Sequence, residues 1–242
     1  METVFVKNYD EMSEKAFNFI ENVIKTTNEP VLCLNTGGTP RGLYKIIVEA
    51  VNNGLDISNT TIFVLDEYIG PEDAPYTVKT YMKENFLNLI ETQPKEVHFI
   101  DGSTENINDE IERYKKLLSK HPRQFQLLGM GTNGHIGANE PGTSFDSEMF
   151  LADHTESTIE STRKEYDLTE EETPNQMITL GFSEILEAEK ILLLVSGNHK
   201  AEATRDLIEG EVTEENPASV LRTHDNTSVI IDEEAASLLS NK

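Results

Sequence analysis

The segment that decides the fold reads Phe125-Gln-Leu-Leu-Gly-Met-Gly-Thr-Asn-Gly-His-Ile-Gly-Ala-Asn-Glu-Pro141. It opens with an apolar run, residues 125–128, of the kind expected for a buried strand. Four glycines fall within the next nine residues, so the backbone there can turn sharply and approach a ligand closely. The loop also carries one imidazole, His135, and one carboxylate, Glu140. This pairing at a strand end indicates proton-transfer chemistry.

The same loop matches the dinucleotide-binding pattern, with glycines at positions 129, 131 and 134 after a strand. That pattern requires a helix to begin at the third glycine, so that its N-terminus can face a pyrophosphate. Here Gly137 and Pro141 follow closely and no amphipathic run begins. We therefore predict no nicotinamide or flavin site, and no other cofactor.

Strand and helix signals alternate along the chain. Strands are expected at residues 4–6, 31–34, 61–65, 97–100, 125–128, 191–195 and 229–231. Helices are expected at residues 10–25, 76–90, 106–118, 199–208 and 233–239, and another after Thr39 as N-cap with Pro40 at its first position. This alternation predicts an α/β fold: a doubly wound, mostly parallel Rossmann-like sheet with helices on both faces.

We interpret residues 1–242 as a single domain, because no internal repeat or linker divides them. One segment stands apart, since residues 153–174 are rich in Thr, Ser and Glu and poor in apolar residues. It is either a solvent-exposed loop or a mobile lid over a site.

Composition narrows the classes of partner. The net charge of −24 argues against nucleic acid or an anionic membrane surface. The single cysteine, Cys33, excludes an intramolecular disulfide, and its apolar strand indicates a small core residue. No signal peptide and no apolar run of transmembrane length is present, so we expect a cytoplasmic protein. The sequence leaves the oligomeric state open, a homo-oligomer included.

Four segments with candidate catalytic or phosphate-binding residues follow predicted strands. Ligands bind at these strand ends in open parallel sheets. The four segments span residues 36–39, 66–68, 131–140 and 196–200. The first, Thr36-Gly37-Gly38-Thr39, leads into a helix N-terminus and would suit a phosphate. Lys200, in the last, could add a point charge to that phosphate.

The other two segments would supply acids and bases. Asp66 at the top of a buried strand would be partly desolvated, which raises its basicity, although it could instead cap a turn. Glu140 could hold the tautomer and orientation of the His135 imidazole. No metal site is predicted, because the six histidines are scattered without ligand spacing. No Gly-x-Ser-x-Gly nucleophile elbow is present either.

Taken together, these motifs resemble those of the glucosamine-6-phosphate deaminase family over nearly the whole chain. The resemblance rests on Thr36-Gly37-Gly38-Thr39-Pro40, Leu65-Asp66-Glu67-Tyr68-Ile69-Gly70, Asn133-Gly134-His135-Ile136-Gly137, Asn139-Glu140-Pro141-Gly142 and Ser196-Gly197 with Lys200-Ala201. It implies conversion of glucosamine 6-phosphate and water to fructose 6-phosphate and ammonia in amino-sugar catabolism. The reaction couples an aldose–ketose isomerisation to deamination and needs no metal or organic cofactor.

The resemblance also implies roles for individual residues. Asp66 would move the proton between C2 and C1. His135 would assist ring opening, with Glu140 holding it, and Asn133 would belong to the same catalytic set. The phosphate cradle would consist of Gly37, Gly38, Thr39 and Lys200.

The chain departs from the family pattern at several positions. Asn133 stands beside the histidine where many members have Asp, Ala138 stands where Phe is common, and Thr77-Val78 replaces Ser-Tyr. In the lid, Lys164 takes the place of a phosphate-gripping arginine, with Arg163 one residue earlier. We expect Arg163 or Lys164 to reach the substrate phosphate when the lid closes.

Two other functions stay open. One is a phosphogluconolactonase-like sugar-phosphate hydrolase, against which the retained Asp66 and the His135–Glu140 pair argue. The other is a catalytically weak sugar-phosphate-binding regulator. The altered lid favours it, but no DNA-binding segment accompanies the domain.

Overall fold

Seven parallel strands form the central sheet of the computed structural model, which describes residues 1–240. Their order across the sheet is β1-β10-β9-β6-β2-β3-β5, and every neighbouring pair is parallel. The strands span Glu2–Val6 (β1), Val31–Leu34 (β2), Thr61–Val64 (β3), Glu96–His98 (β5), Phe125–Gly129 (β6), Ile191–Val195 (β9) and Thr227–Asp232 (β10). Strands β2, β3, β9 and β10 are buried throughout, as expected where helices cover both faces of a parallel sheet.

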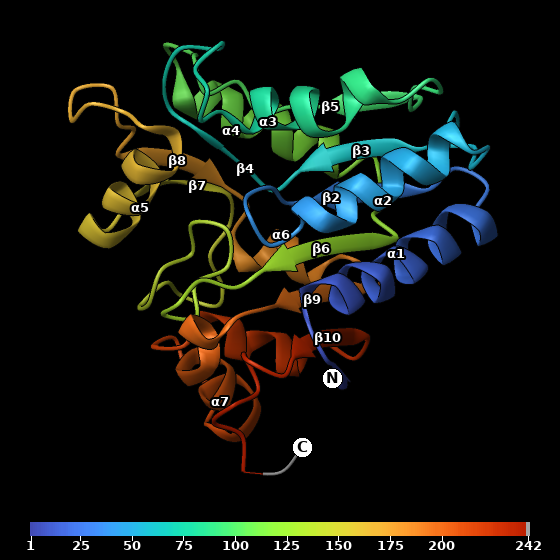
Figure 1. Ribbon diagram of the computed structural model, residues 1–242. Helices are drawn as coiled ribbons and strands as arrows, with labels where there is room; N and C mark the ends of the chain where they lie inside the picture. The colour runs from blue at the N-terminus through green and yellow to red at the C-terminus, as the bar shows by residue number, and fades with distance from the viewer. Residues whose placement is uncertain (241–242) are drawn as a thin grey trace.

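The helices cover both faces of this sheet. Figure 1 shows α1 and α2 in front of it and α6 behind. The α-helices span Tyr9–Thr26 (α1), Arg41–Asn52 (α2), Val78–Asn85 (α3), Ile107–Leu118 (α4), Glu156–Tyr166 (α5), Phe182–Leu186 (α6) and Ala201–Glu209 (α7). Short 3-10 helices span Leu87–Leu89 (η1), Asn198–Lys200 (η2) and Pro217–Thr223 (η3). The predicted doubly wound, mostly parallel fold is confirmed.

The direction of winding reverses between β2 and β6. From β2 the chain passes outward to β3 and β5, and then returns to β6, β9 and β10 on the other side. Ligands bind at such a reversal, beyond the carboxyl ends of the strands. The four segments with candidate catalytic or phosphate-binding residues follow β9, β6, β2 and β3, which are consecutive in the sheet. The topology therefore brings them to one edge.

A second, antiparallel sheet lies beyond that edge (Figure 1). It contains β4 (Asp66–Tyr68), β8 (Gln176–Thr179) and β7 (Phe150–Asp153). Asp66 therefore leaves the central sheet after β3 and at once begins a strand of the second. The polar segment 153–174 follows β7 and contains helix α5.

Two predicted helix features were wrong. Residues 233–239 form turns rather than a helix, because the Asp232 carboxylate accepts the Ala235 N–H and closes a tight turn there. The N-cap of α2 is Pro40, not Thr39, and no side chain caps it. The Thr39 hydroxyl instead accepts a hydrogen bond from the Lys200 ammonium, which draws it toward the strand ends.

The predicted helix 76–90 is divided. Its first part is α3, with Thr77 as an N-cap that accepts the Thr80 N–H. Phe86, with φ of −144° and ψ of −71°, leaves the helical conformation and ends α3 before η1 begins. The single-domain interpretation of residues 1–242 stays a prediction. Within residues 1–240, none of the helices combines the length and apolar character needed to span a membrane.

Candidate active site

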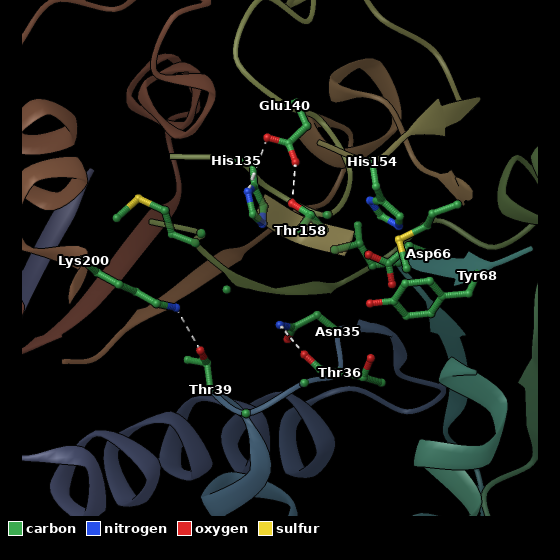
Figure 2. A pocket seen from close by; sticks show the side chains of 18 of the residues that line it. Asn35, Thr36, Thr39, Asp66, Tyr68, His135, Glu140, His154, Thr158 and Lys200 are labelled. Carbon is green, nitrogen blue, oxygen red and sulfur yellow. Dashed lines mark hydrogen bonds and ion pairs between the residues drawn. The ribbon is translucent and has the colours of Figure 1, made fainter. Parts of the chain in front are cut away.

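An open cleft lies over the carboxyl ends of the central strands, with about 890 Å³ of empty space. Its walls include eight of the predicted site residues: Thr36, Gly37, Gly38, Thr39, Asp66, His135, Glu140 and Lys200. An adjoining hollow shares Gly38, Thr39, His135 and Lys200 with it and adds Asn133. Figure 2 shows the labelled side chains pointing into this space from several elements. The fold thus assembles these nine residues around one cavity.

Asp66 lies at the floor of the cleft and is only 8% exposed. Burial disfavours the ionised carboxylate and raises the pKa of Asp66 from 3.8 to about 7. Its backbone pairs with Thr179 of β8, and the Thr179 hydroxyl accepts the Ala138 N–H at 3.2 Å. The second sheet therefore joins Asp66 to the glycine-rich loop. A carboxyl with a pKa near 7 can both accept and return a proton at neutral pH.

The imidazole of His135 is held by Asn133 rather than directly by Glu140. The Nδ1 atom of His135 lies 2.8 Å from Asn133 Oδ1, whereas Glu140 Oε2 is 3.6 Å away. The Asn133 amide in turn donates to Glu140 Oε2 at 2.8 Å. Since Asn133 Oδ1 can only accept, Nδ1 carries the proton and Nε2 keeps its lone pair. Glu140 thus acts on His135 through Asn133.

His135 is positioned and kept neutral by its surroundings. Its ring lies over Gly131, where a Cβ would meet imidazole atoms at 2.2 Å, so no other residue fits beneath it. Burial, and the nearby Lys200 ammonium, lower the pKa of His135, while Glu140 opposes them. At neutral pH the ring is therefore an uncharged base with Nε2 available.

The loop after β2 is held from behind by tyrosines. The Tyr44 hydroxyl donates to the Asn35 carbonyl at 2.9 Å, and the Tyr81 hydroxyl donates to the Gly37 carbonyl at 2.9 Å. In a trans peptide the following N–H points opposite to the carbonyl, so the Gly38 N–H points away from Tyr81. Gly37 has φ of +93°, a backbone conformation that favours glycine. The loop thus presents a peptide donor at the start of α2.

Lys200 brings the positive charge to this loop. Its Nζ donates to Thr39 Oγ1 at 3.2 Å. Burial lowers the pKa of Lys200 to about 8, with Asp232 opposing. Figure 2 shows Lys200 and Thr39 on one side of the cleft and Asp66, Tyr68 and His154 on the other. The cleft therefore separates an anion-binding end from a proton-transfer end.

Helix α5 of the predicted lid lies against the cleft through one row of side chains. Thr158 and Tyr166 line the main cavity and Thr162 lines the adjoining hollow, at the four-residue spacing of one helix face. The Thr158 hydroxyl donates to Glu140 Oε1 at 3.1 Å, and the Thr162 hydroxyl lies 3.4 Å from the Tyr68 hydroxyl.

The two predicted lid cations lie off this row. Lys164 is exposed and pairs with Glu160 at 2.7 Å, and Arg163 is only half-buried. Neither is among the residues that line the cleft or the adjoining hollow. The structure thus brings nine of the eleven predicted site residues together and leaves these two outside.

Known proteins resemble this chain in sequence. Residues 7–230 match the family model of glucosamine-6-phosphate isomerases/6-phosphogluconolactonase. Over 245 aligned residues the chain is 40% identical to the glucosamine-6-phosphate deaminase of Thermoanaerobacter sp. (strain X514), covering all of this chain and 96% of that protein. The chain belongs to the glucosamine-6-phosphate isomerase/6-phosphogluconolactonase family.

Solved structures of the family share the fold. A monomeric glucosamine-6-phosphate deaminase superposes with a TM-score of 0.94 at 37% identity, covering 98% of this chain and all of that one. A 6-phosphogluconolactonase from Trypanosoma cruzi superposes with a TM-score of 0.80 at 20% identity, covering 99% and 97% of the two chains. At that identity the second likeness concerns the fold alone.

Two site residues of this family member were missed by the sequence reasoning. His154, directly after β7, lines the cleft, and neither of its ring nitrogens has a hydrogen-bond partner within the part of the chain that the structure describes. The centroid of the His154 ring lies 5.5 Å from that of the Tyr68 ring, and burial lowers the pKa of His154. His154 lies in segment 153–174, interpreted from the sequence as a solvent-exposed loop or a lid, so no local signal distinguished it.

Glu67 was quoted in a motif without a role. It is 2% exposed, and its carboxylate accepts the N–H groups of Tyr68, Val78 and Lys79 at 2.7–2.9 Å. Burial raises the pKa of Glu67 to about 7, although these bonds oppose the rise. Glu67 thereby fastens β4, which begins with Asp66, to the N-terminus of α3.

Proposed function

We propose that this protein converts glucosamine 6-phosphate and water to fructose 6-phosphate and ammonia, as a hydrolase acting on a C–N bond coupled to an isomerase. One observation carries the proposal: a buried carboxyl with a pKa near 7, Asp66, lies across one cleft from a lysine and a glycine-loop peptide donor. Such a cleft suits a substrate with a phosphate at one end and an acidic C–H at the other. Full-length relatives named glucosamine-6-phosphate deaminase support the choice of substrate.

The phosphate would bind at the loop after β2. The Gly38 N–H, the Thr39 hydroxyl and the Lys200 ammonium would hold it, with the α2 N-terminus favouring negative charge. Thr36 and Gly37 complete the loop. Arg163 and Lys164 would become ligands of the same phosphate only if α5 turned its outer face inward.

Ring opening would come first. Nε2 of His135 would take the proton of the C1 hydroxyl and deliver it to O5 as the C1–O5 bond breaks. Asn133 and Glu140 would stabilise the resulting imidazolium, since Glu140 is the nearest carboxylate to the ring. The open-chain aldehyde would then present its C2 proton.

Asp66 would carry out the isomerisation. As a carboxylate it would remove the C2 proton, giving an enolamine, and as a carboxylic acid it would return that proton to C1. The product is an iminium at C2, to which water adds before ammonia leaves and the ketone forms. A single group can serve both steps because its pKa lies near the working pH.

His154 would recognise the sugar. A buried imidazole without hydrogen-bond partners costs stability unless a ligand satisfies it. Its position in the cleft, on the Asp66 side in Figure 2, makes a substrate hydroxyl the fitting partner.

An ammonia-release assay with glucosamine 6-phosphate tests the function. Release coupled to formation of fructose 6-phosphate is expected. Hydrolysis of 6-phosphogluconolactone without ammonia release would favour the lactonase. Tight binding of the amino sugar phosphate without turnover would favour the regulator. The cytoplasmic location, the absence of a nucleic-acid partner and the oligomeric state stay predictions.

A further inference from the structure

Three metal-binding side chains meet at the edge of the central sheet, outside the cleft. Glu96 and His98 lie two apart on edge strand β5, so they share one face of that strand. His121 follows the end of α4. One ligand atom from each of the three residues lies within 4.8 Å of the others. None of the three lines the cleft or the adjoining hollow.

Glu96 and His98 converge without satisfying each other. Nε2 of His98 lies 2.9 Å from Glu96 Oε2, yet this buried nitrogen has no hydrogen-bond partner of acceptable geometry. An ion bound by both atoms would take the place of this imperfect contact and satisfy the buried nitrogen. The Glu96 side chain is 47% exposed, so an ion could enter from solvent.

His121 is held in the orientation that metal-binding histidines adopt. Its Nδ1 lies 2.8 Å from the Leu117 carbonyl, to which only a protonated Nδ1 can donate. Nε2 is therefore the nitrogen with a free lone pair. A backbone carbonyl that fixes the tautomer in this way is the usual support of a histidine ligand.

Packing fixes both imidazoles in advance. Phe63 contacts both rings, with centroid distances of 4.6 Å to His98 and 5.6 Å to His121. The Tyr114 hydroxyl also donates to the His98 carbonyl at 3.2 Å. Rings that are already ordered lose little conformational freedom when they bind an ion. An ion pair between Glu96 and His98 would not account for the tautomer of His121.

We propose that Glu96, His98 and His121 bind a zinc ion, with water as the fourth ligand. Two imidazole nitrogens and a carboxylate oxygen are zinc ligands, whereas calcium and magnesium prefer oxygen alone. The ion would join the edge strand β5 to the turn after α4. Its role is to stabilise the fold, since none of its three ligands lines the cleft that contains Asp66.

The test uses the untagged full-length protein, freed of metal with a chelator. Calorimetric titration with Zn²⁺ and visible absorption with Co²⁺ should each show one bound equivalent. Glu96→Gln and His121→Gln should weaken binding by at least about 10-fold, the lower end of what even supporting residues contribute at metal sites. Zn²⁺ should also raise the Tm of the unaltered protein and not that of these variants.

Matched controls separate this site from others. His199→Gln removes an exposed histidine outside the proposed zinc site and should leave the Zn²⁺ affinity unchanged. His135→Gln removes the histidine of the cleft and should leave the Zn²⁺ affinity unchanged as well. No binding by the unaltered protein, full binding by Glu96→Gln, or loss of binding only in His135→Gln would overturn the proposal. Glu96 is a surface side chain, so its variant keeps the test valid if His121→Gln fails to fold. Deaminase activity should not change in Glu96→Gln.

Discussion

The floor and the roof of the cleft are built in different ways. The floor consists of the ends of four neighbouring central strands, β3, β2, β6 and β9, most of whose residues are buried. The roof is α5, and among its side chains that the structure describes only Thr162 is buried. The groups with strongly shifted pKa values, Asp66 and Lys200, belong to the floor.

This difference assigns different tasks to the two regions. Proton transfer needs groups held within a fraction of an ångström, and a close-packed sheet edge can hold them. Substrate binding and the exclusion of water from the cleft require less precise positioning, so a less firmly anchored helix can serve them. Floor substitutions should therefore change turnover, whereas roof substitutions should change affinity.

Asp66→Asn should have the largest effect, lowering kcat by ~10²–10⁴-fold, because the positioned acid/base is lost. Binding of fructose 6-phosphate should remain close to that of the unaltered protein. Steady-state kinetics and calorimetry measure the two quantities. Turnover near the original rate would remove Asp66 from the mechanism.

The stability of the same variant supplies its control. Folding raises the pKa of Asp66 from 3.8 to about 7, so the folded state holds the additional proton between these values. The free energy of unfolding therefore falls as pH rises through that window. Asp66→Asn removes this loss and should raise Tm at pH 8 but not at pH 4. A lower Tm at pH 8 would indicate that lost activity reflects damage to the fold.

His135→Gln should lower kcat by about 10²-fold on the cyclic sugar and much less on a ring-open analogue, because its proposed task is ring opening. Glu140→Gln should give a milder defect. Asn133→Ala should be at least as harmful as Glu140→Gln, since Asn133 contacts the imidazole directly. Equal losses on cyclic and open substrates would contradict this role.

The floor should also give kcat/KM a narrow pH optimum. Below about 7 Asp66 is protonated and no longer a base, and above about 8 Lys200 loses its charge. The acidic fall should therefore reflect turnover and the alkaline fall a rising KM. Lys200→Arg should abolish the alkaline fall, because arginine stays charged. An unchanged alkaline fall in that variant would exclude Lys200 as its source.

His154→Leu should raise KM by about 2- to 10-fold, the range expected for one hydrogen bond to a neutral group, with a smaller change in kcat. Met177→Leu, a cleft residue without a polar hydrogen, is the matched control and should have little effect. If both variants behave alike, His154 contributes packing alone.

The smallest effect should come from the outer face of the roof. Alanine at both Arg163 and Lys164 should raise KM by no more than about threefold, through long-range attraction that salt screens. Measurements at low and high ionic strength separate this from contact. A larger rise in KM that persists at high ionic strength would show that the lid binds the phosphate directly. In that case Lys164→Arg should have a lower KM than Lys164→Ala.

The same contrast explains what could be predicted from the sequence. Fully buried parallel strands are nearly continuous apolar runs, so β2, β3, β6 and β9 were located together with the loops after them. Strand β4 has three residues of mixed polarity and exists through pairing with distant β8, which leaves no local pattern.

Site residues divide in the same way. Asp66, His135 and Lys200 follow recognisable strand ends. The position of His154 depends on the antiparallel pairing of β7, and the bridging of His135 to Glu140 by Asn133 depends on side-chain geometry within the loop. The zinc-ligand set combines a Glu-x-His strand with a histidine beyond the next helix, a spacing that matches no compact motif.

The bond from the Thr158 hydroxyl to Glu140 joins the roof to the proton chemistry of the floor. Thermodynamic reciprocity then applies: any change in proton affinity that closure imposes on the Glu140–Asn133–His135 chain is matched by an equal change in closure on protonation. In the proposed ring opening, the proton that His135 takes up would therefore also bias the position of α5. A single threonine hydroxyl would thus couple the proposed lid to the charge state of the active site.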